Sequence, residues 1–263
     1  MSMSTIQRIG DWVGHLVNAR SLHGVHSPFI YQLSAQVLRR GDVPPDCLAI
    51  EQLRDDLLDS DQTIMVNDLG AGSQVMTSPA RRVSDIARTA LKSQREAVLL
   101  YNLARFLRPT TILELGTSFG LSTLYLARGA PEARVYTIEG CPQTHRIAQH
   151  HFELLKQGNI EPVLGSFRTR LPDVMGELDR LDLAFIDGHH EETATLDYVE
   201  KCLGHAHEGT LIIVDDIHWS RGMREAWRAI KDHPKVTITV DLFKMGLVFL
   251  RTEQAPQHFK LRI

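Results

Sequence analysis

The chain has 263 residues, of which 43% are hydrophobic and 23% are charged, and its formal net charge is -3 at pH 7. These values are ordinary for a globular protein of one large or two small domains. The slightly acidic balance gives no electrostatic footprint for nucleic acid or for an acidic membrane surface, so we expect neither as a partner.

The cysteines and the apolar runs indicate the cellular compartment in which we expect the protein. Cys47, Cys141 and Cys202 are odd in number and lie in no metal-binding spacing, which favours buried thiols in a reducing compartment. No apolar run reaches the length of a membrane span, and the N-terminus has no signal-peptide core. We therefore predict a cytoplasmic protein.

Residues 1–108 predict a helical N-terminal extension, and residues 109–263 predict the main domain. Apolar residues recur at helical spacing in 6–17, 28–38, 48–58 and 84–107, with turns near 41–45 and 68–78. Two interpretations of the extension stay open. It packs on the main domain and provides the contacts of a homodimer, or part of it folds over the cleft as a lid that defines the substrate. The unusual stretch 23–29 fits either interpretation.

The main domain alternates strand-like and helix-like segments. The predicted strands are 111–115, 134–139, 161–164, 182–187, 210–215, 236–241 and 247–251, and the predicted helices between them are 121–128, 144–156, 193–203 and 222–231. Alternation of this kind predicts an α/β fold with a mainly parallel sheet covered on both faces. The gap between the last two strands is too short for a crossover helix, so we expect them to pair antiparallel.

The run from Thr111 to Thr123 predicts a strand that enters a tight turn before a helix. Glu114, Gly116 and Gly120 mark the turn, where glycine permits backbone angles and a close ligand approach that a side chain forbids. Ligands of open α/β sheets bind at this edge. The spacing differs from the G-x-G-x-x-G turn of dinucleotide-binding proteins. The run 64–73 also enters a Gly-x-Gly turn, but no acid-ended strand follows it at the required distance.

Glu139 is the acid that should follow such a turn, since it ends the next predicted strand about 20 residues after Gly120. An acid there accepts hydrogen bonds from two ribose hydroxyls. With it in place, the Glu114-x-Gly116 turn resembles the first motif of class I S-adenosylmethionine-dependent methyltransferases. The resemblance implies S-adenosylmethionine as cofactor. It also implies a Rossmann-like sheet of seven strands, the last pair antiparallel, with the N-terminal helical extension added.

The resemblance also assigns the cofactor-binding residues. It places the turn along the methionine part of the cofactor and the end of the third strand near the adenine. Ser122 either binds the cofactor carboxylate or caps its helix, and Phe167 either stacks on the adenine or belongs to the core. The predicted cofactor-binding residues are Glu114, Gly116, Thr117, Ser118, Gly120, Ser122, Glu139, Gly140, Gly165, Ser166, Phe167 and Asp187.

Three aspartates end the fourth and fifth predicted strands, Asp187 on one and Asp215 with Asp216 on the other. Strand ends converge at one edge of a parallel sheet, and carboxylates held together there repel one another unless a cation or protons compensate. A hard divalent ion such as Mg2+ is the natural compensator. We therefore predict a divalent-metal site at Asp187, Asp215 and Asp216, although Asp187 also fits a role in orienting the cofactor.

This pattern resembles the metal-dependent small-molecule O-methyltransferases of the catechol and caffeoyl-coenzyme A type. Asp187 and Asp215 match the spacing of that family, Asp216 stands where the family has Asn, and His190 stands where it has a catalytic lysine. The Ile-Asp-Gly-x-His and Asp-Asp-x-His-Trp patterns are more similar to a broader bacterial group of class I methyltransferases.

The resemblance implies in-line transfer of a methyl group to a hydroxyl of a small molecule, with a metal ion as an optional helper. An imidazole near its ordinary pKa can take the hydroxyl proton. The predicted catalytic residues are therefore His190, Asp187 and, as the next candidate base, His218. A second interpretation stays open, in which His189 and His190 are ligands or cap the helix that begins near Glu191.

Two other classes of function stay open. One is an NAD(P)-type oxidoreductase on the same kind of sheet, which the absence of G-x-G-x-x-G disfavours. The other is a non-catalytic protein that retains the fold. A nucleic-acid or protein methyltransferase is disfavoured by the near-neutral charge and by the absence of an Asn/Asp-Pro-Pro-aromatic motif.

Overall fold

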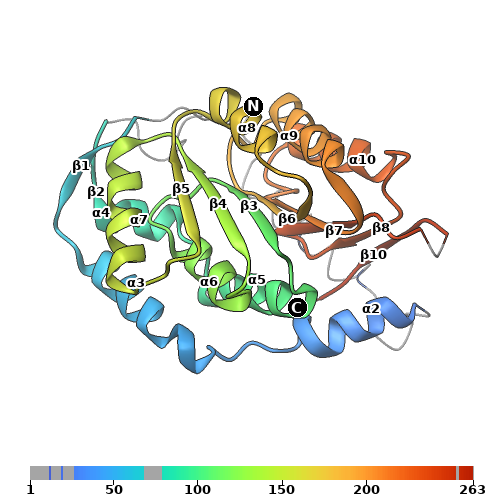
Figure 1. Ribbon diagram of the computed structural model, residues 1–263, viewed down its shortest axis with the longest axis horizontal. Coiled ribbons are helices and arrows are strands. Elements are labelled where there is room, and N and C mark those ends of the chain that lie inside the picture. Colours follow the sequence, from blue (N-terminus) through green and yellow to red (C-terminus); the bar gives the residue numbers. More distant parts are fainter. Residues whose placement is uncertain (1–11, 13–18, 20–26, 68–78, 253–254, 263) are drawn as a thin grey trace. The chain divides into compact units, whose positions relative to one another are not determined.

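The computed structural model describes residues 12, 19, 27–67, 79–252 and 255–262 (Figure 1). Most of the predicted helix at 6–17, most of the stretch 23–29 and the turn at 68–78 lie outside these residues. The chain divides into two compact units, residues 35–177 and residues 1–34 with 178–263. Each unit is described by itself, and the predicted boundary at residue 108 stays a prediction.

The unit of residues 35–177 carries three parallel strands in the order β3-β4-β5 (Figure 1). They are β3 (Thr111–Leu115), β4 (Arg134–Glu139) and β5 (Ile160–Leu164). In the register, Leu115 lies opposite Ile138 and Glu139 lies opposite Leu164. Because the strands are parallel, their carboxyl ends form one edge, and the predicted cofactor turn starts there.

A helix follows each of these strands: α6 (Leu121–Gly129), α7 (Pro142–Leu154) and α8 (Phe167–Gly176). The first two were predicted, and α8, which contains Pro172, was not. Gly129 lets α6 approach α5 (Gln94–Leu107) closely, because a Cβ atom at this position would lie 2.4 Å from the carbonyl oxygen of Tyr101.

The N-terminal part of this unit is mainly helical, as predicted. After a π-helical turn (Ser34–Leu38) and a 3-10 turn (Pro45–Cys47) come α3 (Leu48–Asp59), α4 (Val83–Ala90) and α5. The periodic run 84–107 is divided between α4 and α5, because Ser93 and Glu96 form a capping box that starts α5. The start of the run 64–73 lies in β1 (Thr63–Met65), which pairs with β2 (Ala80–Arg82) in a separate two-stranded sheet, as far as the described residues show.

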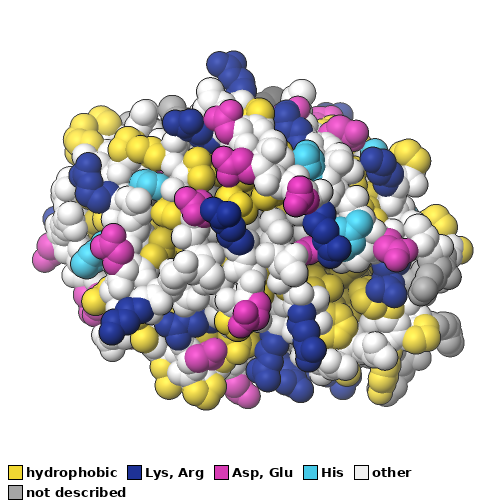
Figure 2. Space-filling view, in the orientation of Figure 1, with side chains coloured by type: hydrophobic (Ala, Val, Ile, Leu, Met, Phe, Trp, Pro, Cys, Tyr) yellow, Lys and Arg dark blue, Asp and Glu magenta, His cyan; other side chains and the backbone are white. Residues whose placement is uncertain are grey.

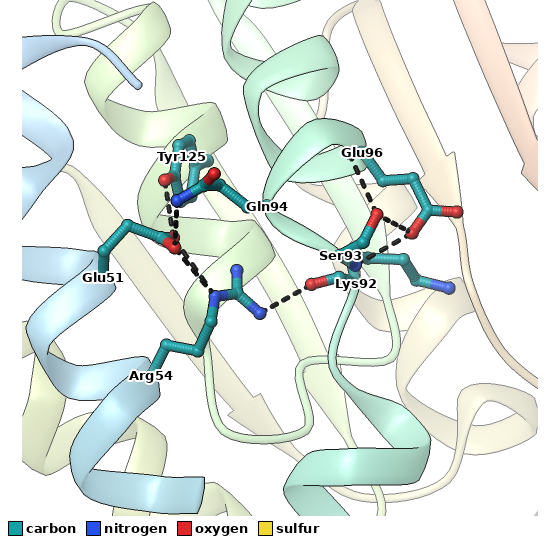
Figure 3. Close-up of polar contacts among 7 residues, drawn as sticks. All are labelled: Glu51, Arg54, Lys92, Ser93, Gln94, Glu96 and Tyr125. Atoms are coloured by element: carbon teal, nitrogen blue, oxygen red, sulfur yellow. Dashed lines mark hydrogen bonds and ion pairs between the residues drawn. The ribbon is translucent and has the colours of Figure 1, made fainter. Parts of the chain in front are cut away.

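A polar network fastens α3 to α5 and α6 (Figure 3). Glu51 accepts hydrogen bonds from the Tyr125 hydroxyl at 2.7 Å and the Gln94 amide at 3.0 Å, and it pairs with Arg54 at 3.1 Å. Arg54 also donates to the carbonyl of Lys92 at 2.7 Å. Burial alone would raise the pKa of Glu51, but the hydrogen bonds from Arg54 and Tyr125 outweigh burial and lower it. Helix α3 is therefore fixed to the helix that begins at the cofactor turn.

The other unit carries five strands in the order β10-β8-β9-β7-β6. They are β6 (Leu181–Ile186), β7 (Ala206–Asp215), β8 (Ile238–Asp241), β9 (Met245–Phe249) and β10 (Gln257–Lys260). Strand β9 pairs antiparallel with both β7 and β8, which confirms the predicted antiparallel last pair. Strand β10 was not predicted and pairs parallel with β8.

Among the described residues, this unit contains the helices α2 (Pro28–Leu33), α9 (Glu192–Gly204) and α10 (Arg221–Lys231). Ser27 caps α2, and the ring of Phe29 packs edge-on against Phe249 at 5.0 Å while Arg251 lies over it at 4.5 Å. Helix α2 thus packs against β9 and the residues that follow it in the same unit.

The parallel strands of one unit and the mixed strands of the other, each accompanied by helices, confirm the predicted α/β fold class, and the described residues add strand β10 to the predicted set. The three cysteines are free and buried, as expected. On the face shown in Figure 2, acidic and basic side chains are interspersed. Among the described residues, no helix has both the length and the apolarity needed to cross a membrane.

Candidate functional site

The turn after β3 has the backbone that its glycines predicted. Gly116 has φ 105°, Ser118 has φ 49° and Gly120 has φ 84°, all in the left-handed region. Only glycine takes up this region without cost, so Ser118 carries some strain. The N–H of Gly116 donates to the carbonyl of Ile138 at 3.0 Å, which fastens the start of the turn to β4.

Glu139 fastens the middle of the same turn. Its Oε2 atom accepts a hydrogen bond from the backbone N–H of Ser118 at 2.8 Å, and its Oε1 atom accepts one from Cys141 at 2.8 Å. Burial raises the pKa of Glu139, although these backbone donors favour the charged form. A carboxylate oxygen has two lone pairs, so each oxygen can accept a further hydroxyl. The side chain therefore fits the ribose of a bound nucleotide cofactor.

Glu114 lies beneath the turn and is fully buried. Its Oε2 atom accepts hydrogen bonds from the hydroxyls of Thr123 and Thr137, the latter at 2.6 Å, and Thr117 bonds Thr137 at 2.6 Å. Burial raises the pKa of Glu114 to about 7. Hydrogen bonding from the side chains of Thr123, Thr137 and Ser122 favours the charged form but does not outweigh burial. Ser122, a predicted cofactor-binding residue, therefore interacts with the buried carboxyl beneath the turn.

The C-terminal end of α7 contacts the turn through His151 and Phe152. The Nδ1 atom of His151 lies 2.8 Å from the carbonyl oxygen of Phe119, inside the turn. Burial lowers the pKa of His151, so the ring is neutral near pH 7 and Nδ1 carries the proton that it donates. The ring of Phe152 fills the space against Gly120. The two consecutive side chains therefore hold both the carbonyl and the glycine of the turn.

Replacing His151 with Leu is expected to weaken cofactor binding by about 5- to 150-fold, because a buried carbonyl left without its donor costs about 1–3 kcal/mol. His150→Leu is the matched control, since His150 is exposed on the same helix. Calorimetric titration with S-adenosylmethionine measures both variants, with thermal unfolding to show that each is folded. A folded His151→Leu protein with wild-type affinity would remove His151 from the support of the turn.

In the second unit, three of the predicted side chains come together. Asp187 directly follows β6 and Asp215 ends β7, and the register Ile186–Val214 places the two aspartates side by side. Donor atoms of Asp187, His190 and Asp215 all lie within 4.8 Å of one another. Within this group, His190 Nε2 lies 3.8 Å from Asp187 Oδ1. Two carboxylates and one imidazole are a donor set that fits a divalent metal ion.

His218 is held in the same unit by a residue that sequence reasoning missed. Its Nε2 atom lies 2.9 Å from Oδ2 of the buried Asp241, and its ring stacks on Phe243 with centroids 5.3 Å apart. Asp241 also accepts the backbone N–H of Phe243 at 2.9 Å. One carboxylate thus fixes both rings. A signal existed in the sequence, since Asp241 is an acid that ends a strand, as Glu139 and Asp215 are.

Left-handed residues other than glycine gather at one edge of this unit. His189 has φ 66° and follows β6, Asp216 has φ 52° and follows β7, and Phe243 has φ 73° and follows β8. These three strands are mutually parallel, so their carboxyl ends share an edge. Strained backbone of this kind clusters at functional sites. The edge that carries Asp187, Asp215 and His218 is therefore the candidate reaction edge of this unit.

Further predicted residues follow the ends of β5 and β7. Asp216 is not part of the three-residue donor group that the described residues form. Ser166 caps α8 through the N–H of Thr169, and Phe167 is the first residue of that helix. Gly165 has φ 145° and donates its N–H to the carbonyl of Glu139 at 2.9 Å. Thr123 and Thr137 were not identified from the sequence as partners of Glu114. The available signal was that both are polar residues within apolar runs.

Comparisons with known proteins show which proteins this chain is similar to. Residues 113–217 match a family described as a methyltransferase domain. The chain is 31% identical to a catechol O-methyltransferase of Mycobacterium tuberculosis over 60% of its own length and 69% of the relative's. It is 28% identical to a catechol O-methyltransferase of Niastella koreensis, over 57% and 68% of the two chains. The fold matches the SAH-bound methyltransferase PaMTH1 of Podospora anserina with a TM-score of 0.60, covering 88% of this chain and 99% of that one at 14% identity.

Proposed function

This chain belongs to the S-adenosylmethionine-dependent O-methyltransferases, and from that premise we propose that it methylates one of two adjacent hydroxyls of a small molecule held by a divalent metal ion. The observation that carries the proposal is the donor group of Asp187, His190 and Asp215 within 4.8 Å. Two relatives named catechol O-methyltransferase support the acceptor class, because catechol has two adjacent hydroxyls that one ion can hold together.

Most of the catalysis in this proposal is positioning. S-adenosylmethionine supplies, when bound, a methyl group that its sulfonium charge makes electrophilic. We assign the ribose hydroxyls to Glu139 and the methionine part to the turn of Gly116 and Ser118, whose backbone Glu139 already holds. Holding two reactants in a reactive geometry can supply about 7–11 kcal/mol of the barrier.

A divalent ion supplies, when bound, positive charge that lowers the pKa of an acceptor hydroxyl. In this proposal Asp187 and Asp215 hold the ion, and a histidine takes the proton that the acceptor loses. His190 and His218 are the candidates. Because Asp241 accepts the Nε2 proton of His218, the lone pair of its neutral ring lies on Nδ1. That fixed orientation favours His218 as the proton acceptor.

The test compares catechol with its isomer resorcinol, whose two hydroxyls are not adjacent and cannot bind one ion together. Protein stripped with a chelator and then reloaded with metal should methylate catechol at least about tenfold faster than resorcinol, the equivalent of about 1.4 kcal/mol. Asp215→Ala should abolish the metal-stimulated rate, and Asp173→Ala, at an exposed surface pair, should not. Equal rates with both isomers, or an unchanged Asp215→Ala protein, would contradict the metal-held diol.

A further inference from the structure

The donor group of the second unit contains a nitrogen. His190 contributes an imidazole, and its Nε2 atom lies 3.8 Å from Asp187 Oδ1. Metal–nitrogen and metal–oxygen bonds of about 2.0–2.2 Å place two ligands of one ion about 3–4 Å apart. The observed separation therefore suits two ligands of the same ion. Asp215, which is 2% exposed, supplies the third donor from the neighbouring strand.

The position of His190 has a clear local cause. The segment after β6 turns at His189, whose φ is 66°. The His189 ring bonds the Tyr198 hydroxyl through Nδ1 at 3.2 Å and packs against that ring, with centroids 6.1 Å apart. The turn thus separates the two adjacent histidines, with the His189 ring against Tyr198 of α9 and the His190 ring beside Asp187. His189 is for this reason a natural control for His190.

Resting on the metal-assisted function proposed above, we infer that His190 is a ligand of the metal ion and that the site prefers a borderline transition-metal ion such as Zn2+ or Co2+ to Mg2+. Mg2+ takes oxygen ligands in near-ideal octahedral geometry, whereas imidazole suits Zn2+ and its neighbours in the first transition row. A lysine at this position, as in the family that the sequence resembles, is a cation with no lone pair to donate. A histidine at this position therefore offers a lone pair to a metal ion, which a protonated lysine does not. With His190 on the metal, His218 is left to take the acceptor's proton.

The test measures metal binding rather than activity. The whole chain is stripped with a chelator and titrated with Co2+ and with Mg2+ by calorimetry, while the visible absorption of Co2+ reports its ligands. The wild type should bind Co2+ at least about tenfold more tightly than Mg2+. His190→Gln and His190→Lys should each lose about 10–100-fold in Co2+ affinity and shift the absorption bands, with little change for Mg2+. His189→Gln should match the wild type in both titrations.

Two results would overturn the inference. One is equal affinity of the wild type for Co2+ and Mg2+, and the other is a His190→Gln protein that keeps both the Co2+ affinity and the Co2+ spectrum. S-adenosylmethionine titration of every variant shows that it is folded and separates this inference from the proposed function. If catechol is methylated in a metal-dependent way but His190→Gln binds Co2+ normally, the inference alone fails. If Asp215→Ala leaves metal-stimulated methylation unchanged, that result contradicts the proposed function, on which this inference rests.

Discussion

Replacing Glu139 with Gln is expected to weaken S-adenosylmethionine binding by at least about 100-fold, because two hydrogen bonds to a charged group are worth about 1.5–3 kcal/mol each. Both carboxylate oxygens already accept a backbone N–H, from Ser118 and from Cys141. A glutamine has one oxygen, so its NH2 group must face one of these two donors. The loss should therefore exceed the loss of a ribose contact alone, since the turn that carries Ser118 also loses its support.

Glu161→Gln is the matched control for this prediction. Glu161 lies on the adjacent strand β5 and pairs with Arg134 at 3.2 Å, but both side chains are more than half exposed. Exposed pairs of this kind contribute about 0–1 kcal/mol to stability, so cofactor affinity should stay at the wild-type value. Calorimetric titration gives both affinities. An affinity of Glu139→Gln within about threefold of the wild type, less than about 1 kcal/mol, would place the ribose elsewhere.

Much of the fold could be predicted because most strands of the sheet are short, mainly apolar runs that end at, or one residue before, an acidic residue or a glycine. The prediction failed where that contrast is weak. Strand β10 has one buried residue among three exposed ones, and it pairs with β8 at the edge of the sheet that the described residues form. Helix α8 has Pro172 in its interior, a residue that argues against helix in a sequence. The break between α4 and α5 was readable from Ser93 and Glu96, which have the spacing of a capping box.

The residue types of the site could be predicted, but their partners could not. Glu139 reaches the turn because β3 and β4 pair in one particular register. The strand pattern in the sequence predicts the two strands but not the register in which they pair. The bond between His218 and Asp241 joins the β7–α10 loop to the end of β8. Each residue taken alone has an ordinary explanation, as a loop histidine or as a strand-ending acid. Only the fold turns them into a pair.

Replacing Gly120 with Ala is expected to destabilise the protein by about 2–5 kcal/mol and to abolish measurable cofactor binding. The φ of 84° costs an L-residue about 1–2 kcal/mol. A Cβ atom there would lie 2.5 Å from the ring of Phe152, and overpacking adds about 1–3 kcal/mol. Thermal unfolding should show the transition lowered by about 5–15 °C. Gly176→Ala, at a helical position with open space, should be neutral or stabilising by up to about 1 kcal/mol.

A double-mutant cycle with Phe152→Ala separates the two causes. Phe152→Ala alone should cost about 3–5 kcal/mol, because the ring is almost fully buried. If the clash matters, the double variant should be more stable than the sum of the two single changes by about 0.5–3 kcal/mol. The backbone cost at φ 84° remains in every variant that carries the Gly120→Ala change, so stability should recover only in part. Full additivity would show that the ring yields freely, and the loss of binding would then come from the backbone of the turn alone.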